Sequence, residues 1–166
     1  MDFFDAVKTR RSIRAYTGER IPKDDLLMII DAGRLAASGH NRQAWTFVII
    51  TEKDTIDQIS RWMNPWIAKA GAVIALVMDP SAPFWLQDGS AATENILLAA
   101  TALGYGSCWL EGTTQRVEEE LKQLLGVPAN LRIQTLITLG VPAEQPSREK
   151  KSLEEVTRWE RFSEEN

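Results

Sequence analysis

The sequence contains one cysteine, Cys108, and one histidine, His40, among its 166 residues. A single cysteine excludes a disulfide within the chain. A protein metal site needs three or four clustered ligands, and two isolated residues do not supply them. A Cys–His or Ser–His catalytic pair would have to use His40, and nothing in the pattern places a nucleophile beside it. The sequence therefore predicts neither a metal centre nor a nucleophilic pair, and Cys108 is interpreted as a packed small residue.

Long apolar runs, an excess of basic residues and a nucleotide-binding P-loop are also missing. No stretch reaches the roughly 18 uncharged apolar residues of a membrane-spanning helix, and the start MDFFDAV lacks the layout of a signal peptide. A formal net charge of −4 and a pI near 5.1 argue against a nucleic-acid partner. No GxxxxGK[ST] segment is present to hold a nucleoside triphosphate. We expect a cytoplasmic protein that binds neither membrane nor nucleic acid.

The chain alternates helix and strand signals without repeats, which favours a single domain over residues 1–166. Apolar runs rich in β-forming residues predict buried strands at 45–51, 71–79, 107–110 and 132–140. Helical patterns cover 2–10, 22–38, 53–61, 83–104 and 114–125. The polar, proline-punctuated end, residues 143–166, is predicted to be a C-terminal arm. Four strands among these helices indicate an α+β or α/β sandwich.

The helix predicted at 83–104 is apolar nearly all round, apart from Gln87, Asp88, Glu94 and Asn95. Such a helix is typically buried on all sides. We therefore expect it in a core or in an oligomer interface.

Two short basic segments lie far apart in this acidic chain. KTRRSIRAYTG, residues 8–18, places Lys8, Arg10, Arg11 and Arg14 around the hydroxyl of Ser12, and SREKK occupies residues 147–151. Lone basic runs are usually solvated turns, but two of them could converge on one phosphate.

Two loops next to predicted strands carry groups suited to a flat polar ligand. ASGHNRQAW, residues 37–45, offers the side chains of Ser38, Asn41 and Gln43 before a buried strand. WLEGTT, residues 109–114, is a second loop between a strand and a helix, again with a glycine, where free backbone N–H groups could point at a ligand. A helix cap followed by a loop explains Ser38 equally well, but not the two amides.

Taken together, these motifs resemble the nitroreductase family of flavin mononucleotide (FMN) enzymes over nearly the whole chain. Four segments carry the resemblance in the family's order: RRSIRAY at 10–16, ASGHNRQAW at 37–45, ALGYGSCW at 102–109, and REK with LEEV at 148–150 and 153–156. Ala37 and Ala44 replace two prolines of the family pattern. The chain is also short, so either 61–69 or 80–85 must cover the flavin, or the flavin is open.

The resemblance implies an α+β fold with a central mixed or antiparallel sheet flanked by helices, in a homodimer with an extended C-terminal arm. It implies FMN as cofactor and flavin sites at the dimer interface. Arg10 and Ser12 would lie near the phosphate with Arg148 and Lys150, and Arg14 would tune the flavin at its N1/O2 edge. Leu110, Glu111 and Gly112 would approach N5, whereas Ser38, Asn41 and Gln43 would come from the other subunit. The implied cofactor-binding set is Arg10, Arg11, Ser12, Arg14, Ser38, Asn41, Gln43, Leu110, Glu111, Gly112, Arg148 and Lys150.

By the same resemblance, the function is a ping-pong relay of hydride from NADH or NADPH through flavin N5 to a nitroaromatic, a quinone or free flavin. No side-chain acid or base is needed for it, because positioning and flavin electronics supply the catalysis. Two alternatives stay open. One is a sister reaction on the same fold, such as reductive dehalogenation, and the other is a non-enzymatic FMN-binding carrier or regulator.

Overall fold

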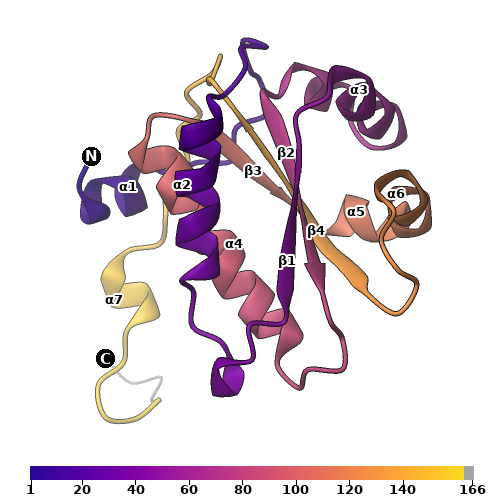
Figure 1. Ribbon diagram of the computed structural model, residues 1–166. Helices are drawn as coiled ribbons and strands as arrows, with labels where there is room; N and C mark the ends of the chain where they lie inside the picture. The colour runs from indigo at the N-terminus through magenta and orange to yellow at the C-terminus, as the bar shows by residue number, and fades with distance from the viewer. Residues whose placement is uncertain (163–166) are drawn as a thin grey trace.

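The computed structural model describes residues 1–162 as one sheet covered by helices on both faces (Figure 1). The elements, in chain order, are α1 (Phe3–Thr9), α2 (Lys23–Arg34), the 3-10 turn η1 (Gly39–Asn41), β1 (Trp45–Ile50), α3 (Lys53–Trp62), the 3-10 turn η2 (Pro65–Lys69), β2 (Ala72–Met78), α4 (Trp85–Ala102), β3 (Gly106–Leu110), α5 (Gly112–Arg116), α6 (Glu118–Leu125), β4 (Arg132–Gly140) and α7 (Leu153–Val156). Within residues 1–162, no helix has the length and apolar content needed to cross a bilayer.

The sheet is antiparallel throughout, with the strand order β1-β2-β4-β3. At one end, Trp45 of β1 lies opposite Met78 of β2, which in turn lies opposite Arg132 of β4. At the other end, Gly140 of β4 lies opposite Gly106 of β3. This architecture confirms the α+β prediction and, between the two sheet types left open, shows the antiparallel one.

Helices on both faces explain why the strands are continuous apolar runs rather than alternating ones. Helices α2 and α4 cover one face, and α3, α5 and α6 lie on the other (Figure 1). Every residue of β2 is buried, as is all of β4 except its first residue. The core therefore lies in two layers on either side of β2 and β4, and the edge strands β1 and β3 lead to the polar loops.

Two helices differ from the sequence-based prediction. The helix expected over 22–38 ends at Arg34, so Ser38 lies in an extended loop rather than at a helix end. The helix expected over 114–125 is broken at Val117, whose φ of −125° and ψ of 24° are not helical. The break lets α5 and α6 each bond to β4 through a different side chain, Thr114 in one and Glu118 in the other.

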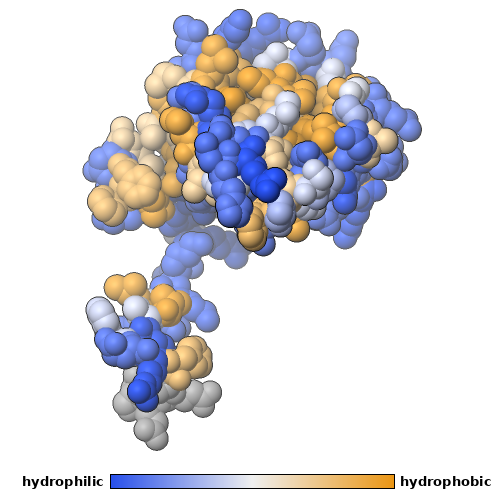
Figure 2. Space-filling model, turned by 60° about the horizontal axis from the view of Figure 1, so that its bottom comes forward, coloured by the Kyte–Doolittle hydropathy of each residue, from blue (hydrophilic) through white to orange (hydrophobic). Residues whose placement is uncertain are grey.

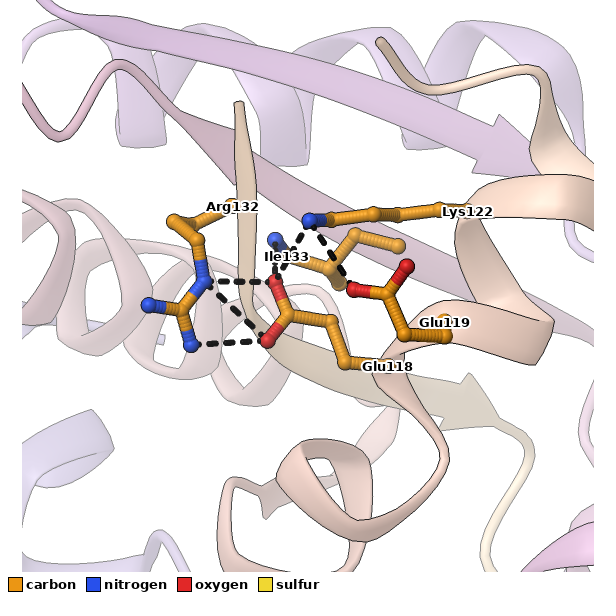
Figure 3. Close-up of polar contacts among 5 residues, drawn as sticks. All are labelled: Glu118, Glu119, Lys122, Arg132 and Ile133. Atoms are coloured by element: carbon orange, nitrogen blue, oxygen red, sulfur yellow. Dashed lines mark hydrogen bonds and ion pairs between the residues drawn. The ribbon is translucent and has the colours of Figure 1, made fainter. Parts of the chain in front are cut away.

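A buried carboxylate joins α6 to the start of β4 (Figure 3). Glu118 accepts hydrogen bonds from Arg132 Nε at 2.8 Å, Arg132 Nη2 at 2.8 Å and the Ile133 backbone N–H at 2.9 Å. Lys122 Nζ lies 3.6 Å from Glu118 and 3.3 Å from the exposed Glu119. Burial raises the pKa of Glu118, but the hydrogen bonds from Arg132 and Ile133 outweigh it, so the net pKa is lowered.

After residues 141–143, which pair with residues 15–17, the chain leaves the body of the protein and carries the short helix α7. Figure 2 shows it standing apart from the main mass with apolar patches on its surface. Leu153, Trp159 and Phe162 are 77%, 86% and 87% exposed. The single-domain and arm predictions, over 1–166 and 143–166, stay predictions, and their last four residues lie outside the described part.

Candidate functional site

The first basic segment is anchored to the sheet by its two apolar members. Ser12 forms a parallel bridge with Ser107, and the Ile13 N–H donates to the Ser107 carbonyl at 2.9 Å. Ile13 and Tyr16 are buried, while Arg14 between them is exposed. The alternation fixes the backbone and leaves the arginine side chain available to a ligand.

Tyr16 is tied down by its hydroxyl group. It donates to the Ile13 carbonyl at 2.8 Å and shares a second hydrogen bond of 2.8 Å with Thr138 Oγ1. Burial raises the pKa of Tyr16 well above its ordinary value. The close packing requires glycine at position 140, where a Cβ would lie 2.7 Å from the Tyr16 ring.

The second basic segment reaches the first because the chain after β4 pairs with residues 15–17. Tyr16 forms an antiparallel bridge with Pro142, and the Ala143 N–H donates to the Ala15 carbonyl at 2.9 Å. A cavity of about 430 Å³ lies where the two segments meet. It is lined by Arg10, Arg11, Ser12, Arg14, Glu144, Pro146, Arg148 and Lys150. We call this the anion cavity, because five of these side chains are cationic.

Two cations of the anion cavity, Arg10 and Arg11, are held by contacts within the chain. Arg10 Nε lies 3.3 Å from Glu94 Oε1 of α4, and only 20% of the Arg10 side chain is exposed. Arg11 folds back on its own backbone and donates from Nη1 to the carbonyls of Lys8 and Arg10, both at 2.8 Å. Arg11 therefore supports the turn, whereas Arg10 is held in place beside α4.

A second cavity, of about 440 Å³, adjoins the loop after β3. Its lining residues are Arg14, Asn64, Trp66, Trp109, Leu110, Glu111, Gly112, Thr113 and Arg116. We call this the loop cavity. Arg14 lines both cavities, so the anion cavity and the loop cavity adjoin at this residue.

Asn64 and Trp66 were missed as site residues by sequence reasoning. They belong to the RWMNPWIAK stretch, which was one of two candidates for covering the flavin, and no motif distinguished them. Of the other candidate stretch, Phe84 packs beside Gly39 and His40. The structure thus brings the first stretch, through η2, to the loop cavity.

The loop at Leu110 is rigidly attached to β4. Thr114 Oγ1 donates to the Leu110 carbonyl and accepts from the Leu136 N–H at 3.3 Å. Thr135 Oγ1 donates to the same carbonyl at 2.9 Å. The backbone N–H groups that follow Leu110 are therefore presented from a fixed turn.

Strand β3 carries two buried polar atoms for which the described residues offer no hydrogen-bond partner, Ser107 Oγ and Trp109 Nε1. Both side chains lie on the same face of β3, because side chains alternate along a strand. Cys108, between them, is buried on the other face, where burial raises its thiol pKa. A raised pKa disfavours the reactive thiolate, in keeping with a packing role for Cys108.

The loop of Ser38, Asn41 and Gln43 is also rigid, but it lies elsewhere. The Gln43 N–H donates to Ser38 Oγ at 3.2 Å, and Gln43 Nε2 donates to Asn41 Oδ1 at 3.1 Å. Asn41 and Gln43 have φ values of 54° and 50°, in the left-handed region that few side chains adopt. Such backbone strain persists only where the surroundings hold it in place, and here the Gly39 N–H bond to Asp88 at 2.9 Å contributes.

The loop of Ser38, Asn41 and Gln43 does not reach the anion cavity or the loop cavity of its own chain. The loop leads into β1, whereas Ser12 and Leu110 lie at β3, on the opposite edge of the sheet. Two strands stand between them, so the edges are about 14 Å apart at the usual strand spacing. Within residues 1–162, no group of three or more His, Cys, Asp or Glu side chains is arranged to hold a metal ion.

Comparison with known proteins gives consistent matches along the chain. The sequence model of the Nitroreductase family matches residues 7–87 and 61–141. A relative from Archaeoglobus fulgidus that bears the name NADH dehydrogenase/NAD(P)H nitroreductase is 38% identical over 148 residues, covering 84% of each chain. An iodotyrosine deiodinase from Thermotoga neapolitana is 24% identical over 186 residues, covering 96% of this chain and 98% of its own.

A solved structure of a nitroreductase also matches along nearly the whole chain. A nitroreductase from Desulfovibrio desulfuricans, in complex with FMN, superposes with a TM-score of 0.86 at 30% identity. The match covers 98% of this chain and 99% of the other.

Proposed function

The chain belongs to the nitroreductase family, and on that basis we propose that it is a homodimeric FMN-dependent oxidoreductase that passes hydride from NADH or NADPH to an oxidised acceptor. The acceptor is a nitroaromatic, a quinone or free flavin, and it follows the nicotinamide at the same site in a ping-pong sequence.

The observation that carries the proposal is the pair of cavities that share Arg14. A phosphate monoester has a charge of about −1.5 to −2 near neutral pH and three acceptor oxygens. Arg10, Ser12, Arg148 and Lys150 supply the matching donors from two distant segments. The anion cavity therefore suits the phosphate of FMN, and the loop cavity beside it suits the flavin ring.

Each part of the chain then has a defined task. Bound FMN would supply the two-electron hydride chemistry at N5. Arg14 places a cation between the two cavities, where it would stabilise negative charge on a reduced ring. Glu111 and Gly112 follow the bonded turn and line the loop cavity, where their backbone N–H groups would approach the flavin ring. Asn64 and Trp66 line the same cavity and would cover part of the ring.

The separation of the two polar sets supports the proposed dimer. Ser38, Asn41 and Gln43 are held rigidly at the opposite edge of the sheet from the cavities. We assign them to the site of a second copy, so that each flavin contacts both chains.

The proposal is tested on the purified protein. Heat-released flavin should chromatograph as FMN, and anaerobic NADH or NADPH should bleach the yellow holoprotein, with colour restored by a quinone or a nitroarene. The faster of the two nucleotides identifies the physiological donor class. A protein that holds FMN but is not bleached by either nucleotide would be a carrier or regulator instead.

A reductive dehalogenase is the second candidate, favoured by the match to an iodotyrosine deiodinase along most of the chain. Reduced holoprotein mixed with iodotyrosine would then release iodide. Reoxidation by quinone without iodide release separates the two activities.

The shared site is tested with two variants in separately tagged chains, Arg10→Ala/Ser12→Ala and Ser38→Ala/Asn41→Asp. Each homodimer should bind FMN poorly. The first loses donors to the charged phosphate, at about 1.5–3 kcal/mol each, and the second loses hydrogen bonds to the ring edge. The mixed dimer carries both lesions in one site and none in the other, so it should hold about one flavin per two chains. A mixed dimer as empty as its parents would place both sets in one chain's own pocket.

A further inference from the structure

The anion cavity contains one carboxylate among its cations. Glu144 lines it together with Arg10, Arg14, Arg148 and Lys150, and it is the single acidic residue among the lining residues within 1–162. An acidic side chain at a site that suits a dianionic phosphate opposes the binding of that phosphate. This position therefore needs an explanation that phosphate binding alone does not give.

The backbone register places Glu144 there. Tyr16 pairs with Pro142 in an antiparallel bridge, and the Ala143 N–H donates to the Ala15 carbonyl. Two residues further along the same antiparallel pairing, Glu144 stands opposite Arg14. Its Oε1 accepts a hydrogen bond from the Arg14 backbone N–H at 2.5 Å. The carboxylate is thus fixed beside the residue that joins the two cavities.

We propose that Glu144 is a built-in counter-charge that lowers both the affinity of the cavity for FMN and the reduction potential of the bound flavin. The inference rests on the proposed FMN site. The carboxylate repels the phosphate in the anion cavity, and it offsets the positive charge that Arg14 offers to a reduced ring. Glu144 is a positioning residue, because it acts on the cofactor through Arg14 and through its charge.

Glutamine is the informative replacement at this position. Glu144→Gln keeps an oxygen that can accept the Arg14 N–H and removes only the charge, whereas Glu144→Ala removes both. Glu149→Gln is the matched control: this residue lies between Arg148 and Lys150 on the same segment and is exposed, as Glu144 is, but it is not among the lining residues of the cavity. All three changes leave the residues assigned to flavin contact in place.

Flavin affinity is measured on the holoprotein by diluting it serially and following the recovery of free-flavin fluorescence. Glu144→Gln should lower the Kd about tenfold, the effect of two unit charges about 12 Å apart at an effective dielectric near 20. The gain should shrink at high ionic strength, because salt screens partly exposed charges. Glu149→Gln should behave as the wild type, and Glu144→Ala should gain less than Glu144→Gln, because it loses the bond to the Arg14 backbone.

The reduction potential is measured by equilibration with redox dyes, a readout that a purely structural role would not shift in this direction. Glu144→Gln should raise the potential, since a nearby negative charge disfavours the reduced anionic ring. The inference would be overturned if Glu144→Gln had the same Kd and potential as Glu149→Gln, or if it bound FMN with a higher Kd than the wild type. A wild-type protein that takes up no flavin would instead contradict the proposed function itself.

Discussion

The carboxylate of Glu118 bonds α6 to the start of β4. Its removal should therefore lower the free energy of unfolding measurably. Glu118 and Lys122 are each 7% exposed, whereas the Arg132 side chain is 45% exposed. Glu118→Ala leaves the N–H of Ile133 without its partner and removes one of the two carboxylates beside Lys122. Glu118→Gln keeps an acceptor for Ile133 but removes the charge.

The solvent exposure of the partners of Glu118 decides how much unfolding free energy is lost. Breaking a buried ion pair by removing one partner typically costs about 3–5 kcal/mol. Arg132 can turn to solvent, and Glu119 remains 3.3 Å from Lys122, so both cations keep part of their compensation. We therefore expect the low end, about 3 kcal/mol, for Glu118→Ala. For Glu118→Gln we expect about 2 kcal/mol, because hydrogen bonds to charged groups contribute about 1.5–3 kcal/mol.

The assay is urea unfolding at one fixed protein concentration, since the proposed dimer would make stability depend on concentration. Glu119→Gln is the control: its side chain is 78% exposed, and an exposed pair contributes at most about 1 kcal/mol. The pH dependence gives an independent check. The pKa of Glu118 is lowered in the folded protein, so its stabilisation is present above the unfolded pKa and is lost as pH falls through the folded pKa. The wild type should therefore approach Glu118→Gln in stability as the solution is acidified below about pH 4.

Two results would refute this reasoning. One is a Glu118→Ala protein within the error of Glu119→Gln, which would mean that the buried pair costs as much in desolvation as it returns. The other is a difference between wild type and Glu118→Gln that grows on acidification, which would require a raised pKa for the carboxyl group.

Three further predictions concern the cofactor site. Replacing Arg14 with Met should leave a yellow protein whose flavin potential is lower by roughly 30 mV, the equivalent of about 1.4 kcal/mol for a two-electron couple; an unchanged potential would mean that the guanidinium points away from the ring. Gly140→Ala should weaken flavin binding and stability together, because the new methyl group would lie 2.7 Å from the Tyr16 ring, and thermal melting that matches the wild type would contradict the tight packing. The flavin released by heat should be FMN, because the donors of the anion cavity suit a terminal phosphate, and a chromatogram that shows FAD would contradict this.

The sequence by itself determined the elements and the motifs. Continuous apolar runs indicated four buried strands, and strands of that kind form only when both faces of the sheet are covered. The cations clustered around Ser12 in RRSIRAY already indicated an anion-binding segment. Such features depend on neighbours along the chain, where the periodicity of a helix or strand leaves a direct mark.

The tertiary structure decided which distant segments meet. The two basic segments share a cavity only because residues 15–17 pair with 141–143, and the same register puts Glu144 opposite Arg14. The break at Val117 and the entry of Asn64 and Trp66 into the loop cavity likewise depend on contacts with other elements. Strand order and register join residues more than a hundred positions apart, and no local pattern encodes which pairs will face each other.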